Sequence, residues 1–216
     1  MLKPVRVGLI DGGVGRVFDA AVLATRAFGG ACNERCDHGE QIAACVLQHS
    51  PSARLLVASV LDRRREGRVD AVVDGLAWLV DQGAQLVNMS FGMPQPSRRL
   101  AQACHAAAAA GVVLVAAAPA RGGAAFPAAF DDCIGVSGDA RCAPGEVSWL
   151  ATGVADFGTH PFLEPGDPRR GGGASIATAR LSGLLAAWLE AGMEASALRA
   201  ELARQARYVG AERRHA

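Results

Sequence analysis

The chain has 216 residues, 50% of them hydrophobic, which is enough to bury the core of one domain and short for two. Its 22 Lys and Arg residues balance 21 Asp and Glu residues, which argues against the strongly basic surfaces that bind nucleic acid or anionic membranes. We therefore expect a single compact domain over residues 1–216 that binds neither nucleic acid nor a membrane.

The N-terminal residues lead directly into a short apolar run, without the long apolar stretch and cleavage site of a secretory signal. No segment reaches the roughly 18 uninterrupted apolar residues of a membrane span. We therefore expect a cytoplasmic protein whose cysteines stay reduced, namely Cys32, Cys36, Cys45, Cys104, Cys133 and Cys142. Because a CxxxC pair alone does not supply the four ligands of a zinc site, the sequence predicts no metal and no cofactor.

Apolar runs alternate with helical patterns along the chain. The runs are continuous, which is typical of strands buried on both faces of a parallel sheet, and they cover residues 5–10, 55–60, 86–91, 112–117 and 134–137. The helical patterns cover residues 40–48, 69–82 and 97–110, a span from about 175 to before 192, and a span from about 196 to 207. Ser97 can cap the third helix and Gly111 can end it. This order predicts an α/β sheet with functional residues at the C-terminal ends of its strands.

Segments rich in Gly, Pro or charge separate these elements. They predict loops at residues 28–37, 62–68, 119–127 and 159–173. The polar end of the chain, from about residue 208 to 216, is expected to be frayed.

Three polar residues stand at the ends or beginnings of predicted elements. Asp11 follows the first strand and precedes two glycines, where turn formation is the simpler explanation. His38 opens a helix, beside a glycine, Gly39, that would let other backbone approach; a surface position is the simpler explanation here. Ser175 follows a run of glycines at the first turn of an apolar helix, where a serine commonly serves as the N-cap. Together the three would supply an orienting carboxylate, a base and a nucleophile.

The segments that carry these residues resemble the motifs of the subtilisin-like peptidases. The aspartate motif is matched by VGLIDGGV, with Gly12 where threonine is usual, and the histidine motif by DHGEQIA, with Glu40 for threonine. The serine motif is matched by GASIATARLSG, with Ala174 for threonine and Ala179 for proline. Two further segments follow in the family's order, LVNMSFG and then GVVLVAAAPARGG with AFPAAFDDCIGVSG. The resemblance thus extends over nearly the whole chain.

The resemblance implies a three-layer subtilisin-like α/β fold with a mostly parallel central sheet, and a serine endopeptidase. It implies that Ser175 is the nucleophile, that His38 is the general base and then acid, and that Asp11 orients the imidazole. It also implies a cleft for an extended peptide or protein precursor. The residues expected to line this cleft are Ser90, Phe91 and Gly92 along the peptide, and Ala116, Ala117 and Ala118 around the side chain before the cut.

The chain departs from the family pattern where an asparagine normally donates a hydrogen bond to the oxyanion. Pro119 and Ala120 replace Gly-Asn, and Ala120 has no side-chain donor. The backbone N–H of Ser175 remains as one donor, and the second donor is open, with Arg121 or the amides of residues 122–123 as candidates. The sequence therefore predicts a slow enzyme. The chain is also shorter than a typical family domain and shows no propeptide or calcium loop, which favours one dedicated precursor over bulk digestion.

A cluster of arginines precedes the second predicted helix. Arg63, Arg64 and Arg65 lie with Arg68 in a predicted loop, and a solvated basic turn is the simpler explanation. In the family the matching segment forms the second edge of the cleft, so the resemblance implies that these cations face acidic residues of a leader upstream of the cut.

Two other functions remain open from the sequence. A peptide-binding module that has lost catalysis would keep the cleft without reacting with a fluorophosphonate at Ser175. A general housekeeping peptidase would degrade unfolded casein.

Overall fold

The computed structural model describes residues 4–31, 35–62 and 66–212. Within this part of the chain, the main element is a nine-stranded sheet with the order β11-β7-β8-β6-β5-β4-β1-β3-β2. Its strands are β1 (Arg6–Asp11), β2 (Val22–Ala27), β3 (Arg54–Ser59), β4 (Leu86–Met89), β5 (Val113–Ala117), β6 (Cys133–Gly138), β7 (Val147–Trp149), β8 (Phe157–Thr159) and β11 (Tyr208–Val209). Neighbouring strands are parallel, except that β7 and β8 are antiparallel. The predicted mostly parallel α/β sheet is thus confirmed.

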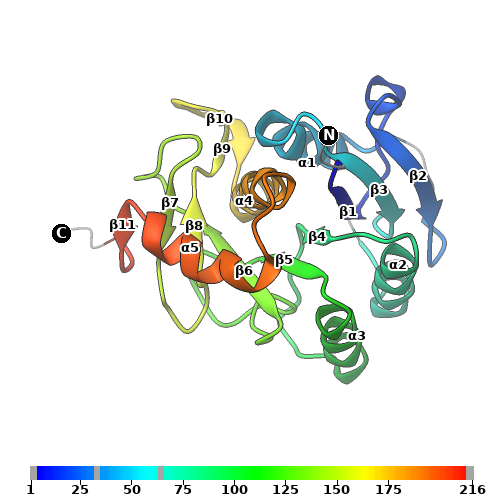
Figure 1. Cartoon of the computed structure of the whole chain (residues 1–216). Coiled ribbons are helices and arrows are strands. Elements are labelled where there is room, and N and C mark those ends of the chain that lie inside the picture. The colour runs from blue at the N-terminus through cyan, green and yellow to red at the C-terminus, as the bar shows by residue number, and fades with distance from the viewer. Residues whose placement is uncertain (1–3, 32–34, 63–65, 213–216) are drawn as a thin grey trace.

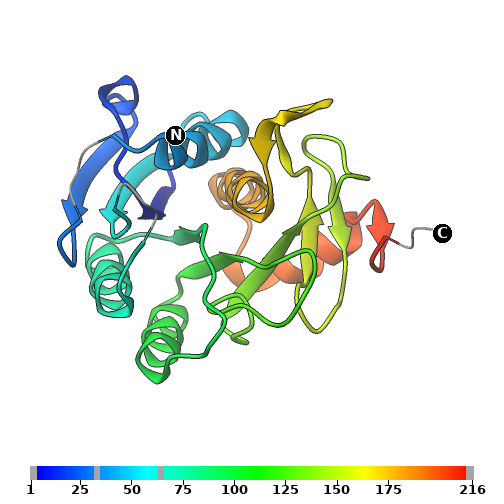
Figure 2. The same ribbon diagram turned by 180° about the vertical axis from the view of Figure 1, so that it is seen from behind.

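Helices cover both faces of the sheet. On one face lie α1 (Asp37–His49), α4 (Ala174–Glu190) and α5 (Leu198–Gln205), and on the other lie α2 (Val69–Asp81) and α3 (Arg98–Ala109). Figures 1 and 2 show α2 and α3 together on one side and α1 and α4 on the opposite side. Short 3-10 helices at Arg16–Phe18 and Ala195–Ala197 complete the helical elements of the described residues.

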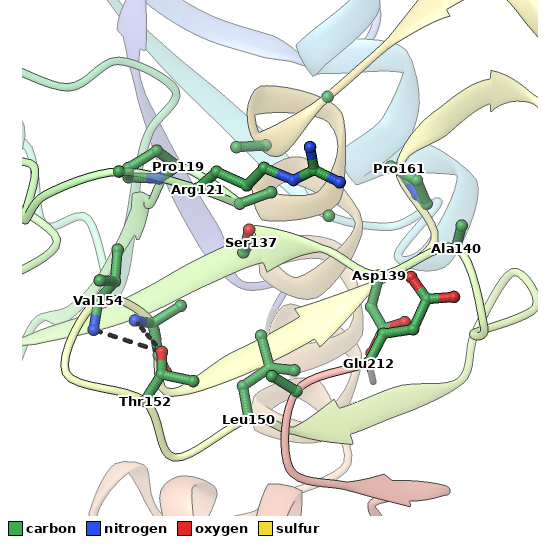
Figure 3. A pocket seen from close by; sticks show the side chains of 17 residues that line it. Pro119, Arg121, Ser137, Asp139, Ala140, Leu150, Thr152, Val154, Pro161 and Glu212 are labelled. Carbon is green, nitrogen blue, oxygen red and sulfur yellow. Dashed lines mark hydrogen bonds between the residues drawn. The ribbon is translucent and has the colours of Figure 1, made fainter. Parts of the chain in front are cut away.

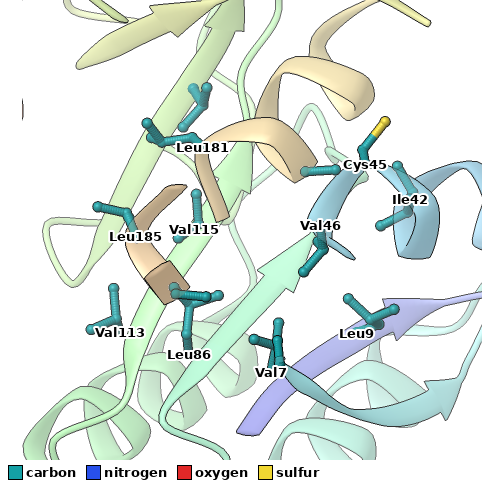
Figure 4. Close-up of a cluster of buried hydrophobic side chains, with 14 of the residues drawn as sticks. Val7, Leu9, Ile42, Cys45, Val46, Leu86, Val113, Val115, Leu181 and Leu185 are labelled. Atoms are coloured by element: carbon teal, nitrogen blue, oxygen red, sulfur yellow. The ribbon is translucent and has the colours of Figure 1, made fainter. Parts of the chain in front are cut away.

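Alternating side chains of the central strands build two hydrophobic layers. In β1, Val7 and Leu9 belong to the layer under α1 and α4, whereas Ile10 belongs to the layer under α2 and α3. In β5, Val115 faces the first layer and Leu114 the second. Figure 4 shows the first layer, with Leu181 and other α4 side chains packed over the strands. Burial on both faces explains why these strands read as continuous apolar runs.

The five predicted strands and five predicted helices are all present, with ends that differ by a few residues. Ser97 caps α3 as expected, because its hydroxyl accepts a hydrogen bond from the Leu100 N–H. Gly111 follows that helix with a φ of 86°, a conformation that favours glycine.

The sequence analysis missed several short strands. The predicted loop over 159–173 is wrong in part, since it contains an antiparallel hairpin of β9 (Phe162–Glu164) and β10 (Asp167–Gly172). The expected frayed end is wrong for Tyr208 and Val209, which form β11 beside β7. Strands of two or three residues are too short to show a periodic pattern. The longer β2 is an edge strand with mostly half-buried side chains, so it lacks a strong apolar run.

The β9–β10 hairpin is attached to α4 by a buried arginine. Arg180 is 2% exposed, and its guanidinium donates to the carbonyl oxygens of Phe162 at 2.9 Å and Leu163 at 3.2 Å. It also donates to Gln48 in α1, at 3.2 Å. Since β10 runs directly into α4, these bonds hold the segment that leads to Ser175.

Candidate active site

The register of the central strands brings several predicted site residues to one edge of the sheet. Ile10 in β1 pairs with Met89 in β4, which in turn pairs with Ala116 in β5. The residues that follow, among them Asp11 and Ser90, therefore emerge side by side at the C-terminal edge. Ligand and catalytic sites of open parallel sheets lie at this edge.

Asp11 and His38 form a buried pair. Asp11 ends β1 with 0% exposure, and its Oδ1 lies 2.9 Å from Nδ1 of His38, which is 7% exposed. The same oxygen accepts a hydrogen bond from the Gly12 N–H at 2.7 Å. Because a carboxylate can only accept, we assign the proton of the neutral imidazole to Nδ1. Nε2 is then left as the basic nitrogen, which a general base requires.

Two glycines, Gly12 and Gly39, allow close contact between helix α1 and the turn after Asp11. A Cβ atom on Gly39 would lie 2.6 Å from the carbonyl oxygen of Gly12 and 2.9 Å from that of Gly13. A Cβ atom on Gly12 would lie 2.6 Å from Cβ of Cys36, so the Cys36 side chain fills the space beside Gly12. This contact gives a steric reason for glycine at position 12, where the family usually has threonine.

Ser175 lies in the first turn of α4, as predicted, but it is not the N-cap. That position belongs to Gly173, whose φ of 122° favours glycine. The Ser175 hydroxyl donates to the Ser90 carbonyl at 2.9 Å, and the Ser90 hydroxyl donates to the Ser175 carbonyl at 3.1 Å. The start of α4 is thus attached by two hydrogen bonds to the segment after β4.

The structure pairs Asp11 with His38 and Ser175 with Ser90. Among the hydrogen bonds of the described residues, none joins His38 to Ser175. Catalytic hydrogen bonds are often formed or shortened only when substrate binds, so this arrangement is compatible with a triad. A rotation about the Cα–Cβ bond of Ser175 would be enough to move its hydroxyl away from the Ser90 carbonyl.

Ser90 belongs to a buried network of hydrogen bonds that also includes Asn88 and Ser182. Asn88, which is 0% exposed in β4, donates from Nδ2 to Oγ of Ser90 at 2.9 Å. The Asn88 Oδ1 accepts from the hydroxyl of Ser182 in α4 at 2.9 Å. The sequence analysis did not assign these two residues. Two features of the sequence could have pointed to them: Asn88 is a polar residue within an apolar strand, and Ser182 lies two helical turns after Ser175, on the same face of the helix.

The other predicted cleft residues lie in three places. Ser90 is buried, Phe91 is half-buried and Gly92 is exposed after β4, where an extended peptide could pair. Ala116, Ala117 and Ala118 are buried at the end of β5, and their role as pocket walls stays a prediction. Arg63, Arg64 and Arg65 lie outside the described residues.

A cavity of about 560 Å³ opens beside the start of α4. Its lining comes from the segments after β5 and at the end of β6, from the start of α4 and from three other places. The lining residues are Pro119, Ala120, Arg121, Gly122, Ser137, Gly138, Asp139, Ala140, Leu150, Thr152, Val154, Ala155, Pro161, Gly173, Ala174, Ala211 and Glu212. Figure 3 shows the Arg121 side chain extended along one wall, with Asp139 and Glu212 on the opposite side. Ala120 is exposed and offers no side-chain donor, as the sequence indicated.

On the acidic side of this cavity, Arg141 is paired with Asp139. Its guanidinium binds the Asp139 carboxylate with three hydrogen bonds of 3.0, 3.2 and 2.7 Å. Burial raises the pKa of Asp139, but the hydrogen bonds from the Arg141 side chain and backbone N–H outweigh it, so the pKa lies below its ordinary value. Glu212 also interacts electrostatically with Arg141 and helps to raise the pKa of that guanidinium.

Two buried cysteines, Cys45 and Cys142, are poor alternative nucleophiles because their pKa values are raised. Cys36, Cys45, Cys104, Cys133 and Cys142 are free thiols, and Cys32 lies outside the described residues. Burial raises the pKa of Cys142 to about 11 and also raises that of Cys45. Thiols of this kind are un-ionised near neutral pH and poor nucleophiles.

The described part of the chain offers neither a cluster of metal ligands nor a membrane-spanning helix. No group of three or more His, Cys, Asp or Glu side chains there is arranged to hold a metal ion. No helix in those residues is both long enough and apolar enough to cross a membrane.

Known proteins resemble this chain in sequence and in fold. Residues 22–215 match the model of the subtilase family. Subtilisin DY of Bacillus licheniformis is 30% identical over 184 residues, which cover 73% of this chain and 67% of the relative. A cold-adapted subtilisin-like serine proteinase superimposes on 93% of this chain and 81% of its own, with a TM-score of 0.71 and 22% identity. A lanthipeptide protease superimposes on 93% of this chain and 77% of its own, with a TM-score of 0.66 and 17% identity.

The chain therefore belongs to the subtilase family, a family of serine endopeptidases with an Asp-His-Ser triad. The predicted subtilisin-like fold is confirmed. The family match begins at residue 22, so it does not include Asp11. The contact between Asp11 and His38 is what connects this first motif to the rest of the site.

Proposed function

We propose that this chain hydrolyses peptide bonds with Asp11, His38 and Ser175 as its catalytic triad. The observation that carries the proposal is the buried 2.9 Å contact between Asp11 Oδ1 and His38 Nδ1, at the same sheet edge as a serine in the first turn of α4. Family membership makes peptide hydrolysis the expected chemistry.

Each residue has a defined task in this mechanism. His38 Nε2 takes the proton of the Ser175 hydroxyl as Oγ attacks the scissile carbonyl carbon, and then gives that proton to the leaving amine. Asp11 holds the imidazole in the required tautomer and stabilises its cation. Water then repeats the sequence on the acyl-enzyme, which releases the second product and restores Ser175. The serine needs this help because its hydroxyl is un-ionised near neutral pH.

The substrate we propose is a precursor with a leader, bound in extended form along Ser90, Phe91 and Gly92. Main-chain groups after β4 would pair with the peptide as an added strand. Two features of the sequence favour a dedicated precursor over bulk protein. Ala120 replaces the family's asparagine, which predicts slow turnover. Residues 63–65 are all arginine, and the family resemblance implies that they would select an acidic leader.

One specific precursor is worth testing first. The sequence resembles the peptidase that removes the leader from the cysteine-crosslinked small subunit during quinohemoprotein amine dehydrogenase maturation. This choice rests on the sequence resemblance alone. Mass spectrometry of that precursor before and after incubation with the protein tests it, since a processed subunit of the expected mass must appear.

Variants of the triad test the catalytic assignment. Ser175→Ala should abolish cleavage and lose only the hydrogen bond to Ser90, worth about 1 kcal/mol of stability. His38→Ala and Asp11→Ala should be nearly as damaging, and the losses should not add because the three residues act as one unit. A folded Ser175→Ala variant with wild-type cleavage would refute the nucleophile assignment. Casein degradation by the wild type would favour a housekeeping peptidase, and absence of any cleavage or labelling would favour a peptide-binding module.

A further inference from the structure

The cavity beside α4 lacks the family's asparagine donor, and its wall carries an arginine that is unpaired within the described part of the chain. Ala120 stands where the family has its oxyanion asparagine, and the next residue along the same wall is Arg121. The start of α4, at Gly173 and Ala174, lines the same cavity. Ser175, the proposed nucleophile, is the next residue of that helix.

The Arg121 guanidinium is available to a substrate. It is exposed, and it makes no hydrogen bond or ion pair with another residue of the described chain. On the far side of the cavity, Asp139 is hydrogen-bonded to Arg141, and Glu212 interacts electrostatically with the same guanidinium. Figure 3 shows the Arg121 side chain extended along the wall, separate from these carboxylates.

The start of α4 already favours negative charge at this place. The first backbone N–H of the helix with an intrahelical acceptor is that of Ala177, which donates to the Gly173 carbonyl at 3.1 Å. No hydrogen bond between described residues uses the N–H groups of Ala174, Ser175 and Ile176, and the helix dipole places partial positive charge there. An oxyanion formed on Ser175 would face these N–H groups, and one further donor from the cavity wall would complete its coordination.

We propose that Arg121 is a catalytic residue that donates a hydrogen bond to the oxyanion of the tetrahedral intermediate, in place of the family's asparagine. The proposal rests on the proposed function of Ser175. As the Ser175 oxygen attacks, the carbonyl π electrons move to the substrate oxygen, which becomes the oxyanion. They return when the C–N bond breaks and the amine leaves with the proton from His38. Arg121 gains and loses no proton, because a guanidinium stays charged at working pH.

A charged donor differs from the neutral amide that it would replace. Hydrogen bonds from an ionised donor are about twice as strong as neutral ones, so a less favourable position can still be effective. A different role for Arg121, recognition of a substrate carboxylate, predicts another kinetic pattern. That role would act on the ground state and change KM for acidic substrates, whereas an oxyanion donor acts on kcat for every substrate.

The test compares Arg121→Ala, Arg121→Gln and Arg121→Lys with a matched surface control, Arg98→Ala. Arg98 is an exposed arginine at the start of α3 and does not line the cavity. In subtilisin, removal of the oxyanion asparagine costs about 10²–10³-fold in kcat, and we expect a loss of that order for Arg121→Ala with KM nearly unchanged. Arg121→Lys should be intermediate, and the control should match the wild type.

Two further readouts exclude a merely structural role. Added guanidinium ion, below denaturing concentration, should restore part of the kcat of Arg121→Ala in a saturable manner, whereas an equal concentration of NaCl should not. A peptide aldehyde forms an adduct that imitates the oxyanion, so its Ki should rise by the factor by which kcat/KM falls.

Fluorophosphonate labelling separates the two possible failures. If wild-type Ser175 is not labelled, the proposed function fails. If Ser175 is labelled but Arg121→Ala keeps its kcat, or loses only KM toward acidic peptides, the role of Arg121 as an oxyanion donor is overturned while the triad stands.

Discussion

Substitution of Gly39 by alanine tests how the triad histidine is positioned. The added Cβ atom would lie 2.6 Å from the Gly12 carbonyl oxygen, whereas ordinary contact begins near 3.4 Å, so the first turn of α1 must move by about 0.8 Å. His38 precedes Gly39 in that turn. The same movement would stretch its 2.9 Å bond to Asp11 beyond hydrogen-bonding distance.

Gly39→Ala has two opposite effects on stability, which partly cancel, but its effect on activity is not offset. Overpacking costs about 1–3 kcal/mol, and alanine gains about 1 kcal/mol over glycine inside a helix. We therefore expect Gly39→Ala to lower the free energy of unfolding by about 0–2 kcal/mol. A misplacement of about 1 Å in a catalytic group can cost 10²-fold, so kcat/KM should fall by about that factor.

Urea unfolding and peptide hydrolysis measure the two quantities separately. Gly153→Ala is the matched control, since a Cβ atom there meets nothing within 4 Å and the residue is exposed outside any helix. The control should keep wild-type stability and activity. Wild-type kcat/KM in folded Gly39→Ala would refute the reasoning that close backbone approach positions His38.

Three other changes give distinct expectations. Ala120→Asn should raise kcat modestly or not at all, because Pro119 indicates a reshaped loop; a hundredfold gain would show that the family geometry is retained. Changing the three arginines of residues 63–65 to Gln should raise KM for an acidic leader and weaken the dependence of KM on salt. Equal KM values for the variant and the wild type across a range of ionic strength would favour the simpler interpretation, a solvated basic turn without a role in binding. The depressed pKa of Asp139 means that its contribution to stability is complete above its ordinary value of 3.8 and is lost as pH falls below it. Arg141→Gln should therefore move the acid-unfolding midpoint, followed by circular dichroism, to higher pH, and an unchanged midpoint would contradict this role of Arg141.

The sequence was sufficient to predict the five central strands of the sheet, the five α-helices and the positions of the candidate triad residues. Continuous apolar runs identified the buried strands because these bury both faces, as Val7, Leu9 and Ile10 do in β1. The three polar residues were recognisable because each stands at an element boundary within a family-like motif. Their catalytic roles remain a prediction.

Contacts between distant segments could not be predicted in the same way. The bonds between Ser90 and Ser175 join residues 85 positions apart, and nothing local in either segment signals them. The contact between Cys36 and Gly12 depends on how the segment before α1 packs against the turn after Asp11. The role of Arg180 could not be predicted because its guanidinium donates to backbone carbonyls, and no acidic residue in the sequence marks it as a buried arginine. Short strands such as β8 and β11 form only because neighbouring strands already exist.

The central claim is that Asp11, His38 and Ser175 act together as a triad, and mass spectrometry after fluorophosphonate labelling tests it most directly. The account predicts one adduct per wild-type chain, located on the peptide that contains Ser175. His38→Ala and Asp11→Ala should be labelled far more slowly, because both lack an effective base for the Ser175 hydroxyl. An adduct on another residue, or a wild-type labelling rate in folded His38→Ala, would contradict the triad.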